Sequence, residues 1–235
     1  MTEQKASNEA RRAILTAVRE HLAASAAADA VYAEGEHGVK MPASRMAPVM
    51  LQSEGSLVQR FRQALEAVAG HCLIVASENE AAAAVQQIIE QTKAQLVAIS
   101  DAPLVRRVLE QSETSATLLE QCMPPALFDC DLGITSAQWA VAETGTLVLE
   151  SEAEQHRLAS LVPPIHVAII EAGRIRETLA EVLQSIGEKG RDEMSRTVTF
   201  ITGPSRTSDI ELTLAIGVHG PAEVYVIVIQ GEPVG

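Results

Sequence analysis

The sequence predicts an α/β fold of three layers, helix, mostly parallel sheet and helix, and two observations carry that prediction. Short apolar runs rich in Val and Ile alternate with segments whose apolar residues recur at helical spacing. The 235-residue chain is also 47 % hydrophobic but only 3 % aromatic. One sizeable core built from Leu, Ile, Val and Ala follows from that composition.

The elements of the body are marked by caps and by β-branched runs. Ser56 with Gln59, and Ser77 with Glu80, have the spacing of capping boxes. The helices are expected from Leu57 to Val68, from Ser77 to Ile89, from Pro103 to Glu110 and from Leu179 to Ile186. The strands are expected at 72–76, 96–99, 146–150, 166–170, 197–202 and 224–229. Helices fall between several of these strands, so parallel pairing with right-handed crossovers follows.

The N-terminal part of the chain has a different pattern. Residues 1–30 are predicted as a helical arm, because Ser7–Ala24 carries one apolar stripe. Residues 31–52 lose periodicity and collect Gly and Pro, which indicates a flexible linker, a lid, or a segment ordered by a partner. The compact α/β domain is expected to span 53–235.

The composition excludes several classes of function. A net charge of -13 argues against binding to nucleic acid or to anionic membrane surfaces, which need a basic face. No apolar run approaches the length of a membrane span, and the N-terminus lacks a signal-peptide core, so a cytoplasmic protein is expected. The three cysteines, Cys72, Cys122 and Cys130, form no CxxC motif. We therefore expect no metal site and no bound cofactor in this chain.

The stretch 197–229 contains the first candidate site. Its strand 197–201 leads into a loop of Gly, Pro, Ser and Arg206, and Ser208 with Glu211 predicts a capped helix ending near Gly217. A loop of this composition at a helix N-terminus is typical of anion sites, since N–H groups and an Arg fork face the ligand. The alternative is that these residues only make a turn and a cap.

The stretch 133–150 contains the second candidate site. Thr135 with Gln138 predicts a capped helix that carries Trp139, and residues 143–146 then turn into a strand. A carboxylate at such a turn, Glu143, lies at the rim of the sheet and is predicted to contact a ligand or to act in catalysis. The loop at Arg206 is expected at the carboxyl ends of the parallel strands, where ligands of such sheets bind, and Glu143 is expected to line one pocket with it. The alternative is a solvated residue at a helix end, where negative charge is disfavoured.

Neither the histidines nor the usual catalytic motifs give a sharper assignment. No pair of histidines has metal-ligand spacing, and neither GxSxG nor GxGxxG occurs. His166 lies on an apolar strand and is expected to be a hydrogen-bonded core residue. His219, in GVHGP, is placed for a role at the rim.

Four segments in order, GITSAQWAVAETGTLVL, RLASLVPPIHVAII, ITGPSRTSDIE and GVHGP, together resemble the LUD-domain family. The most similar branch is that of lactate utilisation protein C, and the resemblance spans about Leu57 to Ile229. It implies a fold like that of the NagB/RpiA/CoA-transferase superfamily. It also implies a non-redox subunit in an L-lactate oxidation system, which converts lactate to pyruvate with partner proteins that carry iron–sulfur clusters.

A function of another class stays open beside this one. The alternative is a stand-alone enzyme acting on a CoA ester, a sugar phosphate or another small anion, with Glu143 as nucleophile or base. Glu143-Thr144-Gly145 resembles the Glu-x-Gly of CoA transferases only at the level of fold analogy. The catalytic candidates are Glu143, Arg206 and Asp209, and the ligand-binding candidates are Thr144, Gly145, Thr146, Gly203, Pro204, Ser205, Thr207, Ser208, His219 and Gly220.

Overall fold

The computed structural model describes residues 15–17, 55–120, 124–153, 157–189, 195–208, 214–216 and 220–231. Contacts divide the chain into two units, 1–52 and 53–235, and the second contains the α/β body. Residues 15–17 are helical, whereas the rest of the predicted arm and the predicted linker lie outside the described residues. The predicted division into arm, linker and domain therefore stays a prediction.

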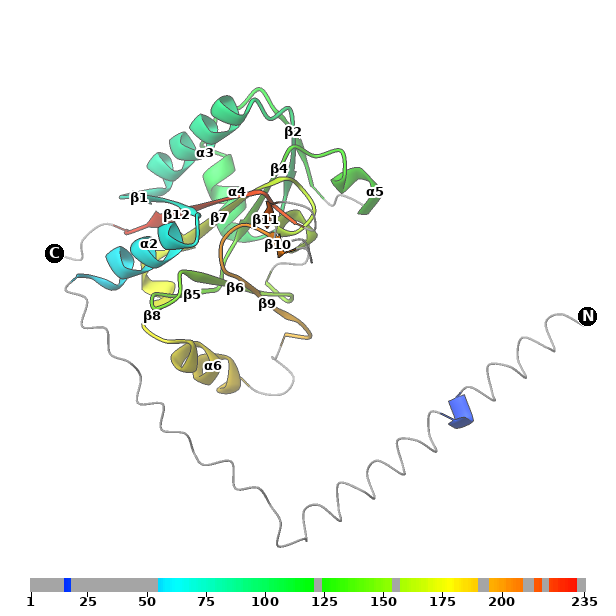
Figure 1. Ribbon diagram of the computed structural model, residues 1–235. Helices are drawn as coiled ribbons and strands as arrows, with labels where there is room; N and C mark the ends of the chain where they lie inside the picture. Colours follow the sequence, from blue (N-terminus) through cyan, green and yellow to red (C-terminus); the bar gives the residue numbers. More distant parts are fainter. Residues whose placement is uncertain are drawn as a thin grey trace, which may run out of the picture. The chain divides into compact units, whose positions relative to one another are not determined.

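A parallel sheet of six strands forms the centre of the body (Figure 1). The strand order is β1-β12-β7-β4-β2-β3, and each neighbouring pair is parallel. The strands are β1 His71–Val75, β2 Leu96–Ile99, β3 Thr117–Leu119, β4 Leu132–Ser136, β7 Ile165–Glu171 and β12 Glu223–Ile229. Because all pairs are parallel, the carboxyl ends of these strands lie at one edge of the sheet and the amino ends at the other.

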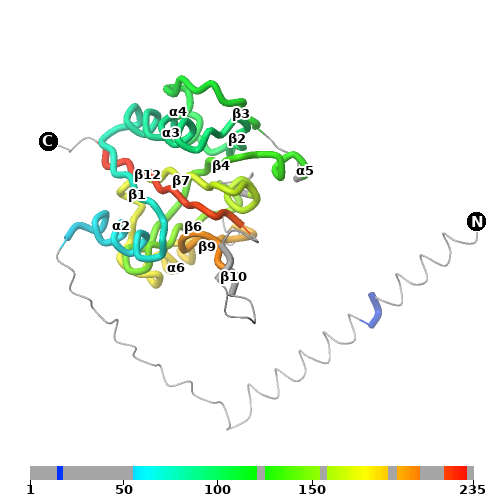
Figure 2. The backbone as a smooth tube through the Cα atoms, turned by 45° about the horizontal axis from the view of Figure 1, so that its top comes forward, coloured from blue at the N-terminus to red at the C-terminus, as the bar shows by residue number. Residues whose placement is uncertain are grey.

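Two helices cover one face of this sheet, as Figure 2 shows. They are α3, Glu78–Thr92, and α4, Pro103–Leu109. The Ser77 hydroxyl accepts a hydrogen bond from the Glu80 N–H at 3.3 Å, so the predicted cap is confirmed. Alanines and isoleucines of α3 pack with the valines of α4 on the side chains of the central strands. This apolar packing is the main source of stability of that layer.

The other face carries helix α2, Leu57–Ala67, and a second sheet. Ser56 caps α2, as predicted, and Phe61 and Leu65 are fully buried. The second sheet has the order β8-β5-β6-β9. Its strands are β5 Trp139–Val141, β6 Thr146–Glu150, β8 Ile175–Arg176 and β9 Val198–Ile201. Helix α6, Leu179–Gly187, packs Val182 and Ile186 on the outer face of this sheet.

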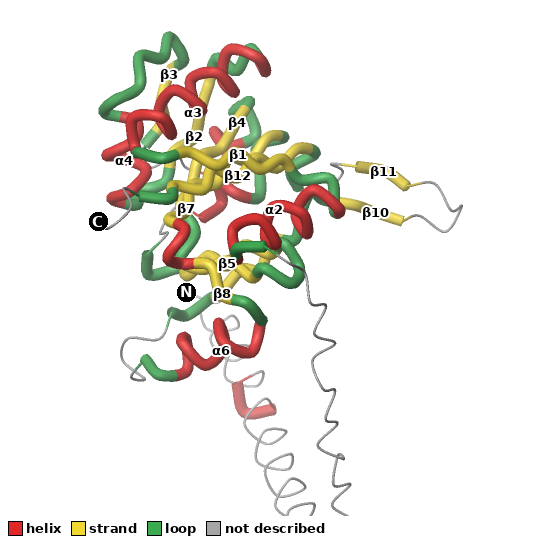
Figure 3. Tube along the Cα trace, turned by 90° about the vertical axis from the view of Figure 1, so that its left-hand side faces the viewer, coloured by secondary structure: helices red, strands yellow, loops and turns green. Residues whose placement is uncertain are grey.

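Shorter elements complete the described part of the chain. They are α5 Pro124–Leu127, the 3-10 turns η1 Arg157–Ser160 and η2 Ala172–Arg174, and the strands β10 Arg206–Ser208 and β11 Leu214–Ile216. Strands β10 and β11 form an antiparallel hairpin that projects from the body (Figure 3).

The predicted fold class is confirmed, but two predicted helices are wrong. Residues 132–141 form strands β4 and β5 rather than a helix from Thr135, because β4 is buried on both faces within the central sheet and β5 is mostly buried within the second sheet. Residues 206–216 contain the β10–β11 hairpin in place of a helix capped by Ser208. The apolar residues there recur at every second position, from Ile210 to Ile216, which is the period of a strand.

The prediction of a single sheet is also wrong in one respect. All six predicted strands exist, but 146–150 and 197–202 correspond to β6 and β9, which belong to the second sheet. Both pair antiparallel there. The sequence gives no periodicity by which a buried strand of one sheet differs from a buried strand of the other.

Candidate functional site

The turn 143–146 and the loop 202–206, which the sequence predicts as a ligand site, lie together and are called the rim below. A chain of hydroxyl groups joins them. Thr144 Oγ1 is 2.7 Å from Thr146 Oγ1, and Thr146 Oγ1 is 2.7 Å from Thr202 Oγ1. The structure therefore brings the two predicted stretches into contact.

The glycines of the rim fit against helix α2. Gly145 and Gly203 have φ values of +66° and +75°, which L side chains rarely adopt. A Cβ atom on Gly145 would overlap with the backbone of Leu65, and one on Gly203 would lie 2.7 Å from the Val68 carbonyl oxygen. Close approach of the rim to the C-terminal half of α2 thus requires glycine at both positions.

The charged candidates of the rim contact the protein's own backbone. Arg206 donates a hydrogen bond from its guanidinium to the Val68 carbonyl oxygen at 2.8 Å, just beyond the end of α2. Glu143 accepts one from the Leu179 N–H at 2.9 Å, at the start of α6. Both interactions satisfy groups that a helix end leaves unpaired. These side chains therefore have a structural role whether or not they bind a ligand.

The rim does not lie where the sequence argument placed it. The Ser205 N–H donates to the Pro221 carbonyl oxygen at 2.8 Å, directly before the start of β12. The loop after β9 thus lies at the amino ends of the parallel strands, and the prediction of a carboxyl-end loop is wrong because β9 belongs to the second sheet.

The remaining candidates of the rim are placed as follows. Pro204 is buried, and Gly220 lies against Ser205, whose Cβ is 3.1 Å from the position of an added Cβ. Thr207 and Ser208 belong to β10. Asp209 and His219 lie outside the described residues. The ligand-binding and catalytic roles of this whole set stay predictions.

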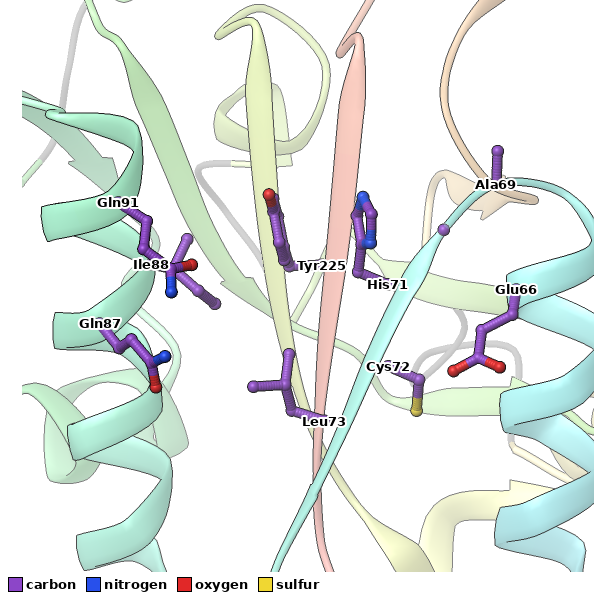
Figure 4. Close-up of a pocket in the computed structure, with 10 residues that line it drawn as sticks. Glu66, Ala69, His71, Cys72, Leu73, Gln87, Ile88, Gln91 and Tyr225 are labelled. Atoms are coloured by element: carbon purple, nitrogen blue, oxygen red, sulfur yellow. The ribbon is translucent and has the colours of Figure 1, made fainter.

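A groove of about 630 Å³ crosses the edge strand β1 between α2 and α3 (Figure 4). Its side chains include Glu66, Cys72 and the stacked rings of His71 and Tyr225, whose centroids are 4.6 Å apart. Burial raises the pKa of Cys72 to about 11, and burial followed by the Glu223 hydrogen bond raises the pKa of Tyr225 to about 12. Both groups are neutral at pH 7. The groove lies at the amino ends of the strands and has no cationic side chain in its lining.

A second cavity, of about 400 Å³, lies where β4 and β7 end, and we call it the carboxyl-edge cleft. Ligands of parallel α/β sheets bind outside the carboxyl ends of the strands. The cleft is lined by Pro103, Leu104, Arg107, Ser136, Ala137, Gln138, Trp139, Glu150, Ala153, Glu171, Arg174 and Lys189. Side chains of α4, of both sheets and of the segment after α6 thus meet at this edge.

The carboxylate of Glu150 is the centre of a polar network in the cleft. Its side chain is only 1 % exposed. Lys189 Nζ donates to both carboxylate oxygens, at 2.6 and 2.7 Å, Trp139 Nε1 donates at 3.0 Å and Ser195 Oγ at 3.3 Å. A buried carboxylate is stable only when its charge is paired and its oxygens are hydrogen-bonded, and both conditions hold. Glu150 therefore fixes Lys189 and Trp139 in the wall of the cleft.

The floor of the cleft is joined to this network by an amide side chain. Gln138 Oε1 accepts a hydrogen bond from the Glu150 N–H at 2.7 Å, and Gln138 Nε2 donates to Ser136 Oγ at 3.2 Å. The capping spacing of Thr135 and Gln138 predicted a helix for Gln138 and Trp139, and Glu150 was not predicted as part of a site. The signal for Glu150 was a carboxylate inside the alternating strand 146–150, where Val148 and Glu150 share a face.

Three cations line the cleft and differ in their partners. Arg107 pairs with Glu78: its Nη2 and Nε donate to Oε1 at 2.8 and 3.0 Å, and Nε also lies 3.3 Å from Oε2. Arg174 lies over the Trp139 ring, 5.5 Å from its centroid, and 3.9 Å from the Glu171 carboxylate. It makes no hydrogen bond to any residue that the structure describes. Arg174 is thus oriented by the aromatic face while its N–H donors stay available.

His166 is a core residue, as predicted. It is fully buried on β7, and its Nε2 is 2.9 Å from Thr135 Oγ1. Its Nδ1 has no hydrogen-bond partner among the described residues. Burial lowers the pKa of His166 to about 3, so the ring is neutral at pH 7. A neutral, enclosed imidazole is not a metal site by itself, and the described residues contain no group of three potential ligands.

Residues 58–229 match the model of the LUD domain family, and this match covers more than half of the chain. The protein belongs to the LUD-domain family. A solved structure, a DUF162 family protein from Deinococcus radiodurans, covers 74 % of this chain and 96 % of its own with a TM-score of 0.58 and 20 % identity. That likeness shows a shared fold.

Several relatives bear the name lactate utilization protein C. The protein from Deinococcus radiodurans is 38 % identical over 100 residues, which are 42 % of this chain and 46 % of the relative. The one from Halalkalibacterium halodurans is 36 % identical over 102 residues, 43 % of this chain and 44 % of the relative. An uncharacterised protein from Neisseria meningitidis is 40 % identical over 100 residues, 42 % of each chain.

These matches confirm the resemblance to the lactate utilisation protein C branch that the four sequence motifs indicated. Each match spans less than half of the relative's length. None of the helices in the described part of the chain is long and apolar enough to cross a membrane.

Proposed function

We propose that this protein is a non-redox component of an L-lactate utilisation system, acting in the cytoplasm with iron–sulfur partner proteins that oxidise lactate to pyruvate. The observation that carries the proposal is the LUD-domain match over 58–229, together with relatives named lactate utilization protein C. The family match concerns the body of the chain, where the rim and the cleft lie.

The cysteine content supports placing the redox step on partners. The sequence has three cysteines, whereas an iron–sulfur cluster takes about four thiolate ligands. Cys72 and Cys130 are buried, and Cys130 Sγ donates to the Ala126 carbonyl oxygen at 3.3 Å. Burial of a thiol in apolar surroundings disfavours the thiolate that binds metal. We therefore propose that this chain contributes ligand binding or assembly rather than electron transfer.

The structure adds nothing in favour of the stand-alone enzyme with Glu143 as nucleophile. One oxygen of that carboxylate accepts the Leu179 N–H, and this contact stabilises the start of α6.

The test is genetic and biochemical. A strain that lacks this chain is expected to lose growth on L-lactate and to keep growth on pyruvate, and the full-length chain is expected to restore it. Affinity purification of the restored chain from lactate-grown cells is expected to recover proteins with the visible absorption of iron–sulfur clusters. Unimpaired growth on lactate without the chain would refute the proposal.

A further inference from the structure

We propose that the carboxyl-edge cleft binds a small metabolite through an oxyanion, a carboxylate or a phosphate group, with Arg174 as the main contact and Arg107 and Lys189 beside it. This site is distinct from the Gly/Ser/Arg loop that the sequence singled out. It also goes beyond the proposed function, because it assigns a ligand class to named residues whatever the pathway is.

The position of the cleft in the sheet supports this ligand site. The cleft lies outside the ends of β4 and β7, which are neighbours in the centre of the six-stranded sheet. That is the edge at which parallel α/β sheets bind ligands. The groove over β1 is larger, but it lies at the opposite edge and has no cation in its lining.

The charged side chains that line the cleft also support an anionic ligand. Three cations, Arg107, Arg174 and Lys189, line the cleft against two carboxylates, Glu150 and Glu171, in a chain whose net charge is -13. The Glu150 charge is neutralised by Lys189, and its oxygens accept hydrogen bonds from Trp139 and Ser195. Arg107 is likewise paired with Glu78, so Arg174, whose Nε lies 3.9 Å from the Glu171 carboxylate, is the cation of the lining that is left to attract an anion.

The hydrogen-bond donors of Arg174 are the third reason to expect an oxyanion in the cleft. Arg174 is 53 % exposed and held over the Trp139 ring, so its planar fork is oriented but not consumed. The neighbouring Arg176, by contrast, donates to the Gly173 and Ile175 carbonyl oxygens at 2.9 and 3.3 Å. A guanidinium fork matches the two oxygens of a carboxylate or phosphate. The volume of about 400 Å³ suits a small ligand.

The chain contains its own reporter for this site. Trp139 is the single tryptophan of the sequence, and it lines the cleft beneath Arg174. We would titrate the full-length protein at pH 7.5 with sodium acetate and, separately, with sodium phosphate, each against sodium chloride of equal ionic strength. A saturable change in Trp139 fluorescence beyond that of chloride is expected, confirmed by calorimetry. Acetate alone identifies a carboxylate ligand, phosphate alone a phosphorylated one, and both a general oxyanion site.

The variants decide whether Arg174 is responsible. Arg174→Gln is expected to weaken anion binding at least about tenfold by calorimetry, and Arg174→Lys by less, because a charge remains without the fork. Arg106→Gln is the matched control. Arg106 and Arg107 are both on α4, with 49 % and 48 % of their side chains exposed, but only Arg107 lines the cleft. If Arg174→Gln does not fold, Arg107→Gln takes its place in the comparison.

Two results would overturn the proposal. One is the absence of saturable binding of either anion by the wild-type protein. The other is equal binding by the Arg106→Gln and Arg174→Gln variants.

Discussion

The rim and the carboxyl-edge cleft both hold an arginine and a carboxylate, but these groups have different partners. At the rim, Arg206 donates to the Val68 carbonyl and Glu143 accepts from the Leu179 N–H, so both are bound to helix ends. In the cleft, Glu150 is buried with Lys189, while Arg174 makes no hydrogen bond to the described residues. The rim's charges stabilise the fold, whereas the cleft keeps a guanidinium available for a ligand.

The difference shows that a loop rich in Gly, Ser and Arg can have a structural role of its own, whether or not it binds a ligand. The rim's glycines are needed because α2 approaches the backbone, and its arginine satisfies a carbonyl at the end of α2. The cleft has no such motif, since its residues come from 103–107, 136–153, 171–174 and 189. A site assembled from separate elements leaves no local signature, and only the strand order brings it together.

The largest expected effect tests the structural role of the rim. Gly145→Ala places a Cβ into the backbone of α2 at a positive φ, so we expect a loss of about 3 kcal/mol in the free energy of unfolding. Urea denaturation followed by circular dichroism measures it. Gly173→Ala is the matched control, since nothing lies within 4 Å of the added Cβ, and it should change stability little. Equal stability of the two variants would mean that the rim is not packed on α2.

The next effect tests the network of the cleft. Lys189→Met leaves the Glu150 carboxylate buried without its ion partner, and we expect a loss of about 2–3 kcal/mol, below the cost for a fully buried pair because Lys189 is 33 % exposed. Glu150→Gln in the same chain removes the unpaired charge and should recover part of the loss. Additive losses in the double variant would show that the two groups are not coupled.

The pH dependence of stability tests the buried His166, which belongs neither to the rim nor to the cleft. The pKa of His166 is about 3 in the folded protein and about 6.5 when unfolded, so the unfolded chain binds the additional proton. Stability from this group is complete above pH 6.5 and is lost as the pH falls toward 3. We expect a loss of about 1.4 kcal/mol between pH 7.5 and 5.5, measured by urea denaturation. His166→Gln should flatten this dependence; an unchanged slope would assign it to other groups.

The sequence was sufficient for much of the fold. Caps at Ser56 and Ser77 and β-branched runs such as 224–229 are local signals, and they placed α2, α3 and β12 correctly. The segment 132–141 was misread because Thr135 and Gln138 have capping spacing, although tertiary burial makes both β4 and β5 strands. Membership of the second sheet depends on long-range pairing, which no local pattern encodes.

The position of the candidate site within the fold was predicted less well, for a related reason. The turn 143–146 and the loop 202–206 meet through the Thr146 and Thr202 hydroxyls, whereas a shared pocket of Glu143 and Arg206 stays a prediction. The sequence argument placed them at the carboxyl edge, because β9 was assumed to lie in the parallel sheet. Glu150 and Arg174 were not predicted as site residues. A carboxylate at the end of a strand and an arginine after a strand are common, and only the structure shows Lys189 beside Glu150 and Trp139 beside both.

The smallest expected change in stability gives the sharpest test of the rim. Arg206 is exposed and makes one hydrogen bond to a carbonyl, so Arg206→Ala should lower the free energy of unfolding by less than about 1 kcal/mol. The sequence-based prediction adds that this variant loses growth on L-lactate far beyond its loss of stability. Thermal unfolding and growth are measured on the same variant, with Arg106→Gln as the control. Loss of growth by a folded variant would show that the rim binds a ligand or partner in addition to packing on α2. Normal growth would mean that Arg206 only caps α2. A single structural hydrogen bond changes stability slightly, and a change of that size does not abolish activity.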